Sequence, residues 1–111
     1  MATTSSDTDG RAGLPAAVVE DILADETRRV ALRILAERGE PMVVESLAAA
    51  VRAAVDDSSV DSVDPDAREA TRHELFAEHI PKLTATGVLE YNSMLGTVEL
   101  KRADIVREQA N

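Results

Sequence analysis

The stretch GVLEYNSMLGTVELK, at residues 87–101, restricts the fold of this chain more than any other. Polar and apolar side chains alternate over residues 88–92 and again over 97–101, the period-two pattern of strands with one buried face. The four residues between them, Ser93-Met94-Leu95-Gly96, are few enough for a tight turn. Gly87 is a typical residue to end a helix, so the sequence predicts a β-hairpin that directly follows a helix.

Helix start and stop signals divide the rest of the chain into helical segments. Pro15 and Pro65 suit a first helical turn, Asp25 and Asp64 can cap helices, and Gly39 can end one. Met42-Val43 could form one short strand. The expected helices are 15–24, 26–38, 44–55 and 65–86, with a short C-terminal helix at 103–110.

Pro81 lies inside the fourth expected helix. Proline removes one backbone hydrogen bond and collides with the carbonyl four residues earlier, so we expect a kink or a split near Ala77. Phe76, Ile80 and Leu83 recur at spacings of four and three, which is the stripe that faces a core. The predicted core residues are Leu23, Val30, Ile34, Leu35, Leu47, Val51, Phe76, Ile80, Leu83 and Val88.

The composition fits one small domain. With 111 residues, the chain can build a modest core. Residues 1–13 are polar and are expected to be a disordered tail, which leaves 14–111 as a single domain. No apolar run is long enough to span a membrane, and no secretory signal is visible, so we expect a cytoplasmic protein.

The formal net charge is −9, and residues 56–111 hold six basic against twelve acidic residues. A surface that binds phosphates usually has the opposite balance. Only two of the twelve basic residues are lysine, however, and such acidity is similar to that of salt-loving archaea, where it keeps proteins soluble. In that setting, salt screens charges strongly and acidity says less about partners.

Two quoted segments carry a resemblance to a known fold. LADETRRVALRILAERGEPMVVESLAAAV and HIPKLTATGVLEY resemble parts of ArsR-like winged helix-turn-helix domains. The RR…L start, the acidic loop at 56–66, HIPKL…GV and Y…GTV look like a family of small winged-helix proteins of halophilic archaea. The resemblance covers about residues 16–101. It implies a mainly α fold with a small β-hairpin, in which 65–86 is the recognition helix and 88–101 the wing.

The resemblance also implies a function, a DNA-binding transcriptional regulator that contacts double-stranded DNA. Arg68 and Arg72 lie four apart on the outward face of the fourth helix, and Lys101 and Arg102 could touch the DNA backbone from the wing. The alternative is that Arg68 and Arg72 pair with Glu69 or Asp66 on a solvated face. The chain would then be a winged-helix module for protein interaction or dimerisation, without DNA binding.

Other kinds of site find little support. His73 and His79 are six apart, which places them on opposite sides of an α-helix, so we expect no metal site. His79 is expected to make a structural hydrogen bond near Pro81. Arg28-Arg29 could be a basic patch, but we expect one of the two to pair with Asp25 or Glu26 instead.

No cofactor, catalytic residue, enzyme activity or small-molecule substrate is expected, because the glycines are scattered and no catalytic spacing occurs. A homodimer could form through the helix at 15–24 and the C-terminal segment. The apolar stripe that motivates it consists of Val18, Val19, Ile22 and Leu23.

Overall fold

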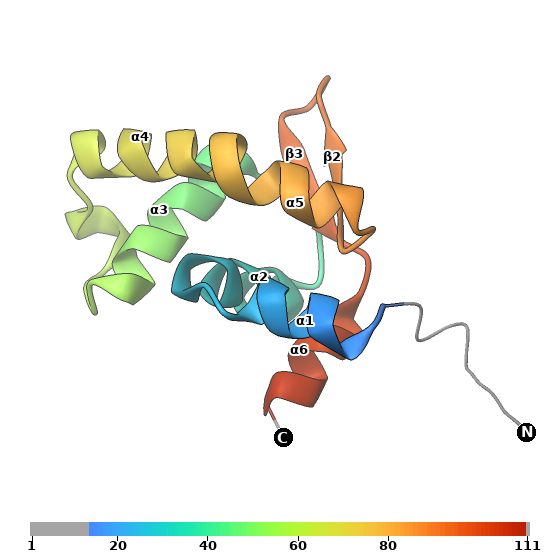
Figure 1. The fold of residues 1–111 in the computed structure, drawn as a ribbon. Coiled ribbons are helices and arrows are strands. Elements are labelled where there is room, and N and C mark those ends of the chain that lie inside the picture. Colours follow the sequence, from blue (N-terminus) through green and yellow to red (C-terminus); the bar gives the residue numbers. More distant parts are fainter. Residues whose placement is uncertain (1–13, 111) are drawn as a thin grey trace, which may run out of the picture.

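The computed structural model describes the chain from residue 14 to residue 110, and its side chains as far as residue 106. The expected disordered tail at 1–13 lies outside the described residues. The described part is mainly helical, with one small antiparallel sheet (Figure 1). The predicted fold class is therefore confirmed at the level of a mainly α domain with a small β element.

The first three helices begin and end where local signals place them. They are α1 (Ala16–Leu23), α2 (Glu26–Arg38) and α3 (Val44–Val55). The Asp25 side chain caps α2 by accepting from the Arg28 N–H, and Gly39 ends it with a φ of 71°. This left-handed backbone favours glycine. Between α3 and the next helix, the acidic loop includes a short 3₁₀ helix, η3 (Val60–Ser62).

The fourth expected helix is divided at the predicted place. It consists of α4 (Pro65–Glu74), a π-helical turn η4 (Leu75–His79) and α5 (Ile80–Ala85). The Ile80 N–H donates to the Leu75 carbonyl, five residues back. Pro81 cannot donate to the Ala77 carbonyl, so the wider turn accommodates the loss without ending the helix. The predicted distortion near Ala77 is confirmed, and it takes the form of a π turn.

The sheet has the strand order β1-β3-β2, formed by β1 (Met42–Val43), β2 (Leu89–Asn92) and β3 (Thr97–Leu100). The hairpin β2–β3 pairs Glu90 with Glu99 and Tyr91 with Val98. Strand β1 adds to the other edge of β3, which confirms the expected short strand. The Val44 N–H, at the start of α3, donates to the Gly96 carbonyl, so the hairpin is also fixed to the helices near its tip.

The helices enclose the core on several sides. Helix α3 packs against both α2 and α4, while α6 (Ala103–Ala110) packs against α2. In Figure 1, α4 and α5 run end to end along one side, α6 lies on the opposite side, and the hairpin stands beside α5. Its tip projects past the helices, which makes the hairpin the most protruding element of the view.

Three of the ten predicted core residues lie at the edge of the core. Leu23, Ile34 and Phe76 are half-buried, packed against the interior. Leu32 and Leu75 are fully buried in their place, with 0% and 1% exposure. Helix α2 is covered by α1, α3, α6 and β3, so a broader face is buried than a single stripe predicts. For Phe76 the cause is the π turn, because the inward residue before Ile80 is five positions back rather than four.

Candidate functional site

Arg68 and Arg72 lie on the outward side of α4, as predicted, but each meets a carboxylate. Arg72 makes two bonds to Glu69, of 2.6 Å and 3.0 Å, and its guanidinium lies 5.6 Å from the centre of the Phe76 ring. The bond from Arg72 lowers the pKa of Glu69 and raises that of Arg72. Arg68 Nε lies 4.0 Å from an oxygen of Glu45, which comes from α3. The alternative of pairing with Glu69 is thus realised for Arg72.

Lys101 and Arg102 lie at the base of the hairpin, far along the strands from its tip. The Lys101 N–H donates to the Val88 carbonyl, where the hairpin begins. The Lys101 ammonium lies 3.6 Å from Glu90 and 3.8 Å from Glu99, and Arg102 makes two bonds to Asp104 of 3.1 Å and 3.0 Å. The four predicted DNA contacts therefore do not form one cationic surface.

The tip of the hairpin exposes apolar side chains. Met94 is 93% exposed and Leu95 is 69% exposed. Asn92 holds the turn, because its side-chain oxygen accepts from the N–H groups of both residues. Tyr91 packs edge-on against Phe76, with ring centres 5.7 Å apart. The tip is therefore an ordered apolar projection connected to the long helix.

The π turn builds a polar cluster that the sequence did not reveal. His79 is 1% exposed, and its Nε2 lies 2.9 Å from Glu74 and 3.9 Å from Asp25. Residues five apart lie nearly above one another in a turn with i→i+5 bonds, but on an ordinary α-helix they are about 140° apart. Glu74 can reach His79 only because this turn is wide.

Arg28 completes the cluster from α2. It donates to His79 Nδ1 at 3.2 Å, and to the carbonyls of Ile22 and Asp21 at 2.9 Å each. Lys82 and Asp21 form a further ion pair between α5 and α1. The expected structural role of His79 near Pro81 is confirmed. The side chains of Arg28 and Arg29 donate to carbonyls at the end of α1, so the structure supports neither a basic patch there nor the expected pairing with Asp25 or Glu26.

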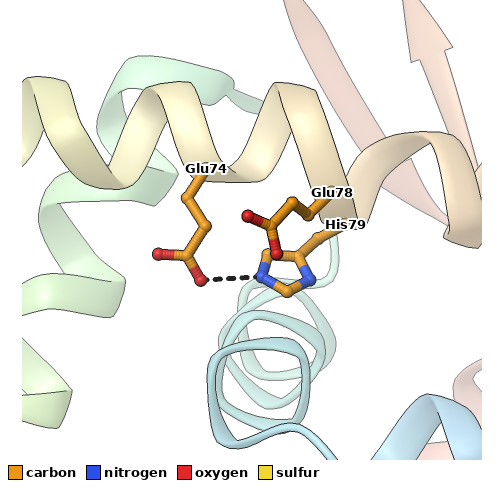
Figure 2. Close-up of side chains that lie close together, drawn as sticks. All are labelled: Glu74, Glu78 and His79. Carbon is orange, nitrogen blue, oxygen red and sulfur yellow. Dashed lines mark hydrogen bonds and ion pairs between the residues drawn. The ribbon is translucent and has the colours of Figure 1, made fainter.

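Glu74, Glu78 and His79 could hold a metal ion by distance alone, since their ligand atoms lie within 4.8 Å of one another. Figure 2 shows the three side chains projecting toward one another from one side of the helix. Arginine has no acceptor, so His79 Nδ1 accepts and the ring proton lies on Nε2, directed at Glu74.

A cation on Nε2 would move that proton to Nδ1, where it would face the Arg28 donor. Metal-bound histidines normally donate this second N–H to an acceptor. We therefore interpret the cluster as a clamp that joins α1, α2 and the long helix.

Residues 20–99 match the model of a family described as a domain of unknown function, DUF7344. The chain belongs to this family. The DUF7344 region runs from the end of α1 to β3, so it includes the clamp, the π turn and the tip of the hairpin. Lys101 and Arg102 fall outside it. No curated protein and no solved structure matches the chain.

Most of the expected dimer surface packs against the core of the domain. Ile22 is 1% exposed, and Val18, Val19 and Leu23 are half-buried against the core. A homodimer through this stripe stays a prediction. Among the described residues, no helix is both long and apolar enough to cross a membrane.

Proposed function

We propose that this domain is a cytoplasmic winged helix that acts through protein contacts, rather than by holding DNA phosphates. In this reading, α4 and α5 correspond to the recognition helix and β2–β3 to the wing. The strand order β1-β3-β2 and the direct passage from the helix into the hairpin support the winged-helix assignment.

One observation carries the functional part of the proposal: each predicted DNA-contacting cation is already paired with a carboxylate. Proteins bind DNA when their cations displace counterions from phosphates. Here Arg72 would have to leave Glu69, and the carboxylate would then remain beside the phosphate. The most protruding part of the wing carries Met94 and Leu95 and no cation, which suits a protein partner better than a polyanion.

A DNA-binding regulator remains the second candidate, and one observation favours it. The Arg68 side chain is 39% exposed and its contact to Glu45 is long, at 4.0 Å. Exposed ion pairs contribute little energy and exchange readily. In this candidate Arg68 and Arg72 are the main contacts, and Lys101 or Arg102 touches the backbone.

Genome-wide crosslinking in the native cell separates the two candidates. The strains would express the natural chain, an Arg68→Ala, Arg72→Ala variant, or a matched Arg33→Ala, Arg38→Ala variant, which removes two exposed cations from α2. We expect no discrete promoter peaks in any strain. Peaks that vanish only with the α4 variant would overturn the proposal and establish the regulator.

The proposed contact with a partner protein is tested by a separate photocrosslinking experiment. A photoreactive amino acid at Met94 should give a discrete protein adduct after irradiation in cells. The same group at Arg33, on the exposed side of α2, is the control and should give no such adduct. Identical adduct patterns from both positions would contradict contact through the wing.

A further inference from the structure

We infer that the outward face of the hairpin binds a basic segment of a partner protein, an inference that rests on the interaction function proposed above. A cationic side chain of the partner would lie at Glu90 and Glu99, and its apolar neighbours would cover Leu95 and Met94. This names the chemistry of the partner and the surface that recognises it.

The first support is the gathering of apolar side chains at the tip. Met94 and Leu95 are neighbours in the turn, and Val43, 46% exposed, lies beside it on strand β1, opposite Thr97. Single exposed apolar residues need no explanation. Here three of the five large hydrophobic side chains that are exposed in the described part of the chain lie at or beside one turn, which makes the tip a candidate contact surface.

The second support is an unfavourable pair of like charges. Glu90 and Glu99 lie directly opposite each other in the β2–β3 register. Like charges in this position destabilise an antiparallel pair. Lys101 serves both carboxylates, at 3.6 Å and 3.8 Å, so one ammonium is shared between two negative groups. The pair retains one net negative charge, and a second cation would stabilise it.

The third support is the shape of the surface between these groups. A hollow of about 460 Å³ has both apolar residues, Pro41 and Leu95, and acidic residues, Glu90 and Glu99, in its lining. No cation lines it. A volume of several hundred Å³ can hold one or two side chains.

The charge of this face selects the occupant. A nucleic acid would bring phosphates to Glu90 and Glu99, and a second copy of the chain would bring the same two carboxylates. A segment with lysine or arginine beside leucine-like residues meets both parts of the hollow. The aliphatic stem of the lysine or arginine can lie on Pro41 and Leu95 while its charge reaches the carboxylates.

The test uses the full chain and a fluorescent synthetic peptide of mixed Lys and Leu, with a Glu and Leu peptide as the comparison. Fluorescence anisotropy reports binding. We expect the Lys–Leu peptide to bind and the Glu–Leu peptide not to bind. A Glu90→Gln, Glu99→Gln variant should bind about tenfold more weakly, the order of loss that removal of a charge-assisted contact causes.

The matched control is Glu45→Gln, Glu69→Gln, which changes the net charge equally but at α3 and α4. It should bind as the natural chain does. Leu95→Ser tests the apolar part separately and should also weaken binding. Thermal unfolding confirms that each variant folds.

Two results would overturn the inference: no binding of the Lys–Leu peptide, or equal losses in the wing variant and the control. Neither result touches the proposed function, which fails instead if promoter crosslinks depend on Arg68 and Arg72. The two failures are therefore distinguishable.

Discussion

The clamp around His79 and the ion pairs of the hairpin β2–β3 use similar groups in opposite surroundings. His79 is 1% exposed and bonded on both ring nitrogens, whereas the side chains of Glu90, Glu99 and Lys101 are 45–67% exposed. A buried polar group must keep its partners, because losing one leaves an unsatisfied group in the interior. Exposed ion pairs contribute little and can be exchanged. The clamp therefore stabilises the fold, whereas the ion pairs of the hairpin can be exchanged, as the proposed protein contact requires.

The largest effect should come from the core beside the clamp. Leu75→Ala removes a fully buried side chain at the start of the π turn, so we expect a loss of about 2–5 kcal/mol in the free energy of unfolding. Leu95→Ala at the wing tip is the matched leucine control and should change it by less than about 0.5 kcal/mol. Denaturant unfolding measures both, and similar losses would contradict the comparison.

Substitutions in the clamp should cause the next largest loss in the free energy of unfolding. His79→Phe keeps a ring but removes both bonds, which leaves Arg28 without its ring acceptor, so we expect a loss of about 1–3 kcal/mol. Arg28→Met should cost a comparable amount, and the double variant should cost less than the sum because the two residues share one bond. Strict additivity would show that the clamp does not act as a unit. Arg33→Gln, on the exposed side of α2, serves as the control.

A smaller effect is expected for the aromatic contact that joins the two regions. Phe76 and Tyr91 meet edge-on at 5.7 Å, between the π turn and the wing. A double-mutant cycle with Phe76→Leu and Tyr91→Leu should give a coupling of about 0.5–1.5 kcal/mol. The same cycle with Phe76→Leu and Met94→Leu should give none, since Met94 lies at the turn. Coupling in both would indicate a general change in the hairpin.

The smallest effect concerns the outward face of α4. The bond from Arg72 lowers the pKa of Glu69 below its ordinary value of 4.5. The contribution of this pair to stability is therefore present above that value and is lost as the pH falls through the folded-state pKa. NMR titration should show the pKa of Glu69 rising in Arg72→Gln. Molar KCl should also raise the pKa of Glu69, because salt screens the pair. A pKa of Glu69 that is unchanged by the substitution would show that the pair does not form in solution.

Local signals in the sequence predicted most of the elements. The caps at Asp25 and Asp64, the stop at Gly39 and the short strands all lie where residue chemistry placed them. These features depend on a few neighbouring residues. The partner of Arg68 could not be predicted, because Glu45 belongs to another helix and only packing of α3 against α4 brings them together.

The misplacement of Phe76 in the core and the missed clamp have one cause. The sequence showed that Pro81 interrupts the helix, but not that the interruption is a wider turn. Counting back from Ile80 in α-helical steps leads to Phe76, whereas the π turn makes Leu75 the inward residue. The same assumption of α-helical spacing places Glu74 and His79 on different sides of the helix, so their contact was not predicted. A spacing of five between apolar residues just before a proline was the only signal in the sequence.

The π turn can also be viewed as one supernumerary residue in an otherwise continuous helix. A relative that lacked one residue between positions 75 and 79 could join its two helices without a break, and its inward leucine would stand four places before the isoleucine. An alignment of such chains would show a single-column gap there. Relatives with the gap should also lack a histidine–glutamate pair at these positions, because without the wide turn the two side chains no longer meet.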